Sequence, residues 1–199
     1  MTGPSAARSA HRYKAHGFTM VELLITVVVL AVLLAIAVPS MREFIARQRV
    51  ESIAKELATD LRYLRTQAIQ RELRVQIRFG SNADMTCYVL FGKGSDDFNC
   101  NCARSDGLPS CGPNSAGAST EYKTVIIRRD RGIELSAQPF RLDLEGTNGL
   151  PRNNQSIQAS VTGTSIGGAV RVFTTTDNLI VPKLCSVSGH HGSMTACAP

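Results

Sequence analysis

The sequence predicts an α+β fold, in which a long N-terminal helix packs on an antiparallel β-sheet or β-sandwich. Three observations support this prediction. An apolar block covers residues 18–38, an amphipathic helical pattern continues to residue 71, and period-two patterns dominate from residue 74 onward. The 199 residues show no internal repeat, and they suffice for one ordinary domain beyond the apolar block.

The apolar block has only three polar side chains, those of Thr19, Glu22 and Thr26. As a helix it is about 32 Å long at ~1.5 Å per residue, close to the ~30 Å hydrocarbon thickness of a bilayer. Leu, Ile, Val and Ala fill every face, which predicts a helix in a membrane or a buried core. Glu22 is the exception, because a carboxylate in an apolar span marks a site with a partner.

The next stretch predicts that the helix continues to Arg71 with one buried stripe. No glycine or proline occurs between Met41 and Phe79. We expect a bend at Pro39, because its nitrogen cannot donate a hydrogen bond to the Ala35 carbonyl. Apolar residues follow at spacings of three and four, which is typical of one helical face: Val50, Ile53, Leu57, Leu61, Leu64 and Ala68.

The remainder predicts about seven short strands. Residues 75–79 alternate in polarity as a half-buried strand does, and residues 86–91 are expected to form its hairpin partner. A loop rich in Gly, Ser, Asn and Asp covers residues 92–119 and holds three cysteines. Further strand patterns cover residues 122–128, 133–135, 140–144, 156–161 and 169–174, with a last apolar stretch at 179–184.

Composition limits the classes of function. The formal net charge is +6, and three of these charges lie in residues 1–17, so the chain from Phe18 carries about +3. That weak basicity does not by itself indicate nucleic-acid binding. Six cysteines behind an apolar export segment predict an oxidising compartment and disulfides. We find no nucleophile elbow, P-loop or paired-carboxylate pattern, so we expect neither an enzyme nor a cofactor.

The start of the apolar block resembles the class III signal of type IV pilins and pseudopilins. The resemblance is carried by Gly17-Phe18-Thr19-Met20-Val21-Glu22, the apolar run and Pro39. It implies that a prepilin peptidase cuts after Gly17 and N-methylates Phe18. Glu22 then matches the acidic fifth residue that acts in assembly, and Pro39 matches the helix-bending proline.

The resemblance also implies a division of the chain. Residues 1–17 would be a cleaved cytoplasmic leader, and residues 18–40 a transmembrane segment that later lies in the filament core. Residues 41–199 would form a periplasmic domain, with an amphipathic helix half at 41–71 and a β-rich part at 74–199. Two alternatives remain: an ordinary secretory signal cut after Ala35-Ile36-Ala37, and a plain signal anchor.

The helix at residues 41–69 resembles the GspH/FimT type of minor pilin, which includes FimU. This resemblance implies a structural subunit that is held in the inner membrane and then built into a type IV pilus as part of its priming or tip complex. Its implied partners are other major and minor pilins, the prepilin peptidase and the inner-membrane assembly platform. The alternatives are a minor pseudopilin of a type II secretion system and a FimT-like DNA-binding pilin used in transformation.

The same resemblance implies a disulfide between Cys185 and Cys197, as in the closed tail of many pilins. The four other cysteines have open connectivity, although Cys100 and Cys102 are poorly placed to bridge each other, which favours Cys87 pairing into the loop. A zinc site would need Cys100, Cys102 and Cys111 with His190 or His191. The spacing C-x-C-x8-C does not match structural zinc sites, so we expect no metal.

DNA contact has two candidate locations. Arg128, Arg129 and Arg131 form the densest basic cluster, but a charged strand end beside a turn is the more frequent explanation. Some FimT-type tails carry a Gly-Arg-x-Arg motif that is implicated in DNA binding. Here Gly189 is followed by His190 and His191, which are mostly neutral near pH 7, so DNA is a possible but disfavoured partner.

We predict that the mature protein begins at Phe18, because the spacing from Gly17 to Glu22 matches the peptidase signal. The intact mass of protein purified from membranes, or its N-terminal sequence, measures this directly. A mature N-terminus at Val38 would instead identify an ordinary secretory signal and would contradict the resemblance to pilins.

Overall fold

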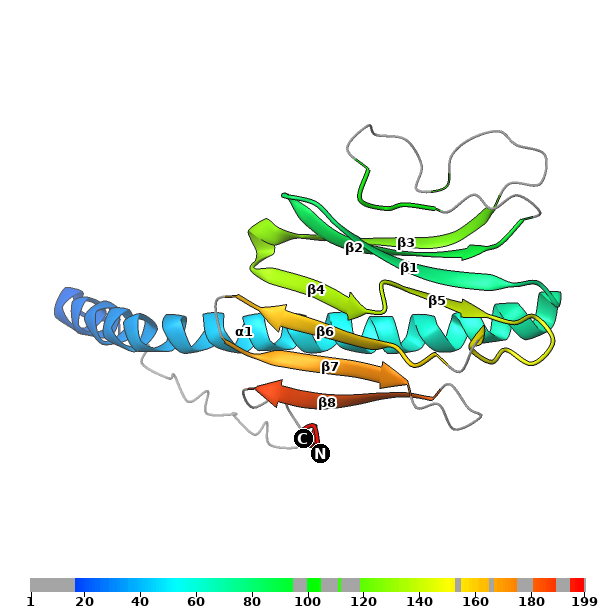
Figure 1. Cartoon of the computed structure of the whole chain (residues 1–199). Coiled ribbons are helices and arrows are strands. Elements are labelled where there is room, and N and C mark those ends of the chain that lie inside the picture. The colour runs from blue at the N-terminus through cyan, green and yellow to red at the C-terminus, as the bar shows by residue number, and fades with distance from the viewer. Residues whose placement is uncertain are drawn as a thin grey trace, which may run out of the picture. The chain divides into compact units, whose positions relative to one another are not determined.

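The computed structural model describes residues 17–94, 100–104, 111, 119–152, 155–164, 167–174, 181–188 and 194–198. One helix, α1 (Met20–Arg71), precedes all strands, as Figure 1 shows. The strands within the described part are β1 (Val75–Ser81), β2 (Met85–Gly92), β3 (Thr120–Arg128), β4 (Ile133–Gln138), β5 (Arg141–Leu144), β6 (Gln158–Gly163), β7 (Ala169–Thr174) and β8 (Pro182–Ser188). A short 3₁₀ turn, η1 (Arg129–Arg131), joins β3 to β4.

The chain divides into two compact units, Met1–Met41 and Arg42–Pro199. The described part of the first unit is the N-terminal part of α1, and the second unit holds the rest of the helix and all the strands. Pro39 lies inside the helix, two residues before the end of the first unit. The bend expected at Pro39 remains a prediction.

The strands form two antiparallel four-stranded sheets. The first has the order β3-β2-β1-β5, and the second has the order β4-β6-β7-β8. The hairpin predicted for β1 and β2 is confirmed, with Ile77 opposite Leu90. The two sheets meet at β2 and β4, where the Leu135 amide of β4 donates to the Thr86 hydroxyl of β2 at 3.1 Å. This arrangement confirms the predicted fold class of a long helix on antiparallel sheet.

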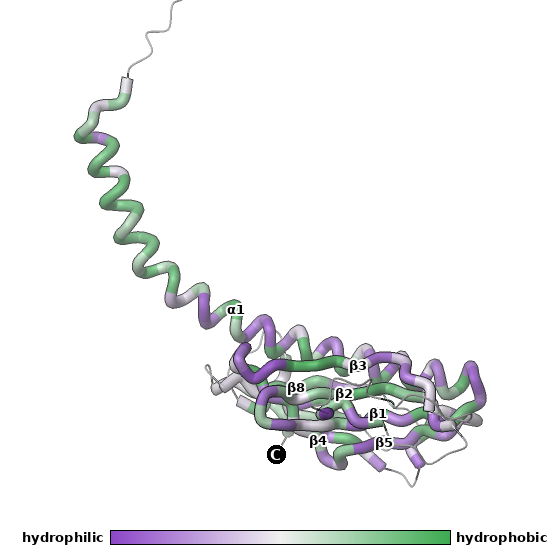
Figure 2. Tube along the Cα trace, turned by 90° about the horizontal axis from the view of Figure 1, so that it is seen from above, coloured by the Kyte–Doolittle hydropathy of each residue, from purple (hydrophilic) through white to green (hydrophobic). Residues whose placement is uncertain are grey.

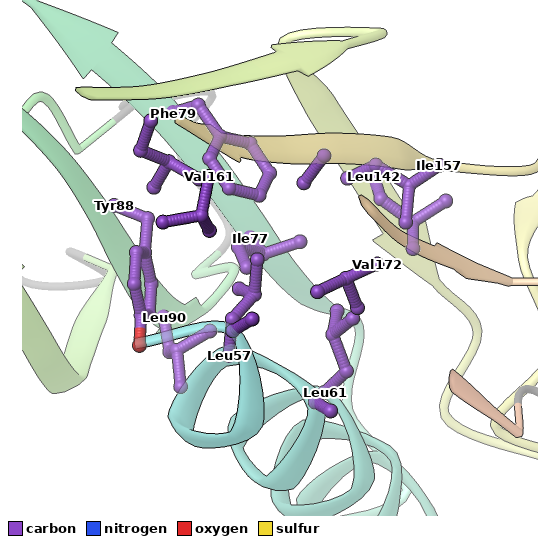
Figure 3. Packing of buried hydrophobic residues seen from close by; sticks show 14 of the residues in the cluster. Leu57, Leu61, Ile77, Phe79, Tyr88, Leu90, Leu142, Ile157, Val161 and Val172 are labelled. Atoms are coloured by element: carbon purple, nitrogen blue, oxygen red, sulfur yellow. The ribbon is translucent and has the colours of Figure 1, made fainter. Parts of the chain in front are cut away.

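One hydrophobic core joins the helix to both sheets. Figure 3 shows Leu57 and Leu61 of α1 pointing toward Ile77 and Leu90 of the first sheet and Val172 of the second. These five side chains are fully buried. Burial of each such aliphatic side chain contributes about 1.5–3 kcal/mol, so this face of α1 fixes the position of both sheets.

The buried face of α1 is wider than the predicted stripe. Val50, Leu57, Leu61, Leu64 and Ala68 are buried as expected, while Ile53 is only half-buried. Two small residues and one acid were missed because the prediction followed large apolar side chains, although small residues also allow close packing: Ala54, Ala58 and Asp60.

A second, smaller hydrophobic cluster covers the outer face of the first sheet. Cys87, Val89 and Phe91 alternate along β2 on the face opposite the main core, and all three are buried. Cys100 and Cys102 of the following loop pack on them. For this reason β2 is buried on both faces, whereas strict alternation of buried and exposed residues would need one face in solvent.

A polar network lies at the edge of the main core. The buried Asp60 carboxylate of α1 accepts a hydrogen bond from the Tyr88 hydroxyl at 2.7 Å and an ion pair from Lys123 Nζ at 2.8 Å. Glu56 also binds Lys123, at 2.8 Å. Burial, followed by the hydrogen bond to Asp60, raises the pKa of Tyr88 well above its ordinary value of 10.0. Burial lowers the pKa of Lys123, but its bonds to both carboxylates outweigh this and leave that pKa raised.

The C-terminal end of α1 packs closely on the loop after β5. Glu72 follows the last helical residue with φ of 52°, the left-handed conformation that usually ends a helix at glycine. Gly146 is buried against this turn, and a Cβ atom there would lie 2.3 Å from the Glu72 carbonyl carbon. Only a residue without a side chain fits at position 146.

The strand boundaries differ modestly from the predicted ones. The predicted 140–144 strand starts at Arg141, and the segment expected at 179–184 instead gives a strand at Pro182–Ser188. The described residues form eight strands rather than about seven. Periodicity locates a strand, but the exact ends of a strand depend on where its partner strand ends, which periodicity does not show.

We predict that Tyr88→Phe lowers the free energy of unfolding by about 1–3 kcal/mol, because it leaves the buried Asp60 carboxylate without one donor. The raised pKa of Tyr88 adds a pH test. A group whose pKa is raised on folding stabilises the fold fully below its unfolded pKa, and this contribution is lost as the pH rises above about 10. Chemical denaturation at pH 7 and pH 11 should therefore show a larger loss of unfolding free energy at the higher pH for the unsubstituted protein than for Tyr88→Phe.

The control is Tyr63→Phe, which changes an exposed tyrosine of α1, and for which we expect a change in unfolding free energy within about 0.5 kcal/mol. Equal effects of the two substitutions would contradict the network's role.

We predict that Gly146→Ala destabilises the domain by about 2–4 kcal/mol, since the backbone of Glu72 and Leu73 cannot yield as a flexible side chain would. The converse substitution, Glu72→Gly, should stabilise it by about 0.5–1 kcal/mol, because glycine adopts positive φ without strain. Thermal unfolding of the detergent-solubilised chain measures both. A neutral Gly146→Ala would show that the loop is free to move away from the helix end.

Candidate functional site

The N-terminal part of α1 is apolar and exposed on every face. In Figure 2 its turns are almost entirely coloured hydrophobic. The large apolar side chains from Phe18 to Val38 are 44–91% exposed, and Met20 is the most exposed of them. Within the described residues, α1 alone is long and apolar enough to cross a membrane, by length and composition. A surface of this kind requires lipid or other apolar segments around it.

The polar side chains of this segment differ in how they are satisfied. The Thr19 hydroxyl accepts the Glu22 amide at 3.2 Å and so caps the first turn, while the Thr26 hydroxyl donates to the Leu23 carbonyl at 2.8 Å. The Glu22 carboxylate makes no hydrogen bond or ion pair with any residue that the structure describes. Of the three polar side chains of the segment, it is thus the one without a hydrogen bond to a described residue.

The cap formed by Thr19 could have been predicted from the sequence, but it was not. Thr19-x-x-Glu22 has the spacing of a capping box, in which a threonine caps the helix and an acid lies three residues later. A carboxylate in the first turn also interacts favourably with the positive end of the helix dipole. Glu22 thus has a local structural role in addition to any role in assembly.

All six cysteines are paired in disulfides. Cys185 bonds to Cys197, as the resemblance implied, Cys87 bonds to Cys102, and Cys100 bonds to Cys111. The three cysteines of the rejected zinc set thus have no free thiolate in this state. Its other candidates, His190 and His191, lie outside the described residues, as does the tail motif weighed for DNA contact.

The C-terminal disulfide fastens the end of the chain to the edge of the second sheet. The Ser186 amide of β8 donates to the Thr195 carbonyl at 2.9 Å, and the Cys197 amide donates back to the Ser186 carbonyl at 2.9 Å. Ser186 and Ala196 form a parallel bridge. The last described residues therefore cover β8 where its outer edge would otherwise be open.

The basic cluster at the end of β3 and in η1 is partly neutralised. Arg129 forms an ion pair with Glu134 at 2.7 Å and donates to the Asn82 carbonyl at 3.2 Å. Arg128 and Arg131 are exposed, and Asp130 lies between them in η1. One of the three arginines is thus occupied by a structural contact, and DNA contact at this cluster remains a prediction.

Two family models match the chain. The prokaryotic N-terminal methylation motif matches residues 12–38, and the family described as type II transport protein GspH matches residues 54–167. None of the curated proteins matches. Both matched regions coincide with the features above: the first covers the exposed apolar segment with Glu22, and the second covers the end of α1 and most of the sheets.

Two solved structures are similar in fold. Both are crystal forms of the type IV minor pilin FimU of Pseudomonas aeruginosa. One is 13% identical with a TM-score of 0.47 and covers 69% of this chain and 90% of its own; the other is 12% identical with a TM-score of 0.44 and covers 67% and 91%. At these values the likeness adds nothing to the family assignment.

The family match extends over more than half of the chain, and the methylation motif stands where the sequence places the peptidase signal. Families of this kind consist of structural subunits. The chain belongs to the family of the type II transport protein GspH, and it carries the prokaryotic N-terminal methylation motif.

Proposed function

We propose that the protein is processed after Gly17, is held in the inner membrane by residues 18–40, and is then built into a type IV pilus as a minor subunit. The observation that carries this proposal is the unpartnered Glu22 carboxylate within an exposed apolar helix. In a helix that only anchored the protein, this acid would interact with no more than the positive end of its own helix. A helix that must leave the bilayer and pack beside others can use it to fix their register.

The cost of placing the Glu22 charge in a membrane and the gain from pairing it in a filament are comparable in size. An ionised side chain costs about 3 kcal/mol at the centre of a membrane helix, and less near the interface. Cleavage after Gly17 would create a positively charged amine on Phe18. An amine and a carboxylate about 4 Å apart gain about 4 kcal/mol at an effective dielectric of 20. A pair between the Glu22 carboxylate and the Phe18 amine of a neighbouring subunit would therefore offset the cost of placing the acid in an apolar surrounding.

The second candidate is a minor pseudopilin of a type II secretion system, and the name of the matching family favours it. The two assemblies use the same segment, so they are separated by where the protein is found. A pilus subunit appears in fibres sheared from the cell surface. A pseudopilin remains with the cell envelope, and its deletion abolishes secretion of folded proteins into the medium. DNA uptake is not proposed, because Arg129 of the basic cluster is paired with Glu134 and the tail at His190 and His191 lies outside the described residues.

We predict that Glu22→Val leaves membrane insertion and the folded domain intact but lowers the amount of protein in sheared fibres at least about tenfold. The expected loss follows from an ion pair worth about 4 kcal/mol, since 1.4 kcal/mol already corresponds to a factor of ten. Cell fractionation measures insertion, and immunoblotting of sheared fibres measures incorporation.

Two variants control for other roles of this turn. Glu22→Gln keeps the size and hydrogen-bonding capacity but loses the charge, so it should behave as Glu22→Val does. Thr19→Val removes the cap that the Glu22 amide uses, at about 1 kcal/mol, and should retain incorporation. Normal amounts of Glu22→Val in fibres would leave Glu22 as a determinant of processing only.

A further inference from the structure

Strand β3 has an open edge. It is the outermost strand of the first sheet and pairs only with β2. In the described part of the chain, the backbone of residues 125–128 makes no hydrogen bond beyond that ladder. No proline interrupts the strand, which is nine residues long. An edge of this kind can accept another extended segment by main-chain hydrogen bonding.

This edge borders a groove between β3 and α1, which we call the α1–β3 groove. Its volume is about 580 Å³. Ile53 of α1 forms one wall, and Val125, Ile126 and Ile127 of β3 form the other. Ile53 and Val125 are half-buried, and Ile126 is 55% exposed. Side chains of an added strand could bury this apolar surface.

Two positive charges line the groove without an ion-pair partner among the described residues. Arg49 of α1 and Arg131 of η1 both line it, and neither forms an ion pair with a carboxylate among the described residues. Glu56 also lines the groove, but its carboxylate is bound to Lys123 at 2.8 Å. The groove thus combines apolar walls with two guanidinium groups that have no ion-pair partner among the described residues, which selects an occupant carrying carboxylates.

We propose that the α1–β3 groove binds an extended, acidic segment of a different, neighbouring pilin-like subunit. The segment adds to the β3 edge, places apolar side chains on Ile53 and Ile126, and pairs its carboxylates with Arg49 and Arg131. This inference rests on the proposed function, because it names a contact inside the same assembly. A second copy of this chain is a poorer occupant, since the chain from Phe18 is itself weakly basic.

Photocrosslinking in cells tests this proposal on the full chain. Benzoylphenylalanine is introduced at Ile126, and in a second strain at Ser52 on the opposite wall, in case substitution of Ile126 blocks docking. Val187 of β8, which is 43% exposed, provides the control position. We expect both groove positions to crosslink to another pilin-like subunit, at a peptide containing Asp or Glu, and Val187 not to do so.

Charge reversal separates the groove from general basicity. Arg131→Glu should reduce the crosslink from Ile126 at least about tenfold, while Arg128→Glu, an exposed arginine three residues away that does not line the groove, should leave it unchanged. Equal thermal stability of the two variants establishes that both fold. Equal losses in the two variants would overturn the proposal.

The remaining outcomes are distinguishable. Crosslinks only to copies of this chain, or the same products from Val187 as from the groove, would overturn the acidic-partner proposal. If the unsubstituted protein is present in sheared fibres but neither groove position crosslinks to another subunit, this inference fails while the proposed function stands. If the protein is absent from fibres and is required for secretion instead, the pilus assignment fails, and a crosslink to a pseudopilin would still support the groove.

Discussion

The packing of one helical face against two sheets is the interaction on which the domain depends. Leu57, Leu61 and Leu64 are fully buried, and side chains of both sheets contact this face. The sheets share no strand, but β4 of the second sheet lies against β2 and β3 of the first, and α1 packs in the same core as both sheets. A shift of the helix by one residue would rotate this stripe by about 100° and remove both sheets' support at once.

The surface of the same helix is different before residue 41. There it is apolar all round and exposed, whereas after residue 42 only one face is apolar and buried. A core helix of a soluble protein would be mostly buried along its length, so exposure distinguishes the two cases better than hydropathy alone. The methylation motif and the GspH match follow this division of the helix, the first ending at residue 38 and the second beginning at residue 54.

Local patterns predicted the helix, the β1–β2 hairpin and most strands, because each depends on residues close in the sequence. Other features depend on contacts that no local pattern contains. Gln76 looked like a solvent-facing strand residue, but it is buried and bound to Asp143 of β5. The burial of Asp60 on the helix was not predicted, because it depends on the contacts of its carboxylate with Tyr88 and Lys123. The N-terminal site could be predicted because it is one continuous motif, whereas the α1–β3 groove joins residues more than 70 positions apart.

The covered edge of β8 has a consequence for aggregation of the protein. Unpaired strand edges are where the sheets of separate molecules fuse into aggregates. Backbone bonds from Ser186 to Thr195 and Cys197 close this edge, and the Cys185–Cys197 bond ties the closing segment to the strand it protects. One disulfide thus holds the cover of this edge in place, whereas the β3 edge of the other sheet pairs with no further strand among the described residues.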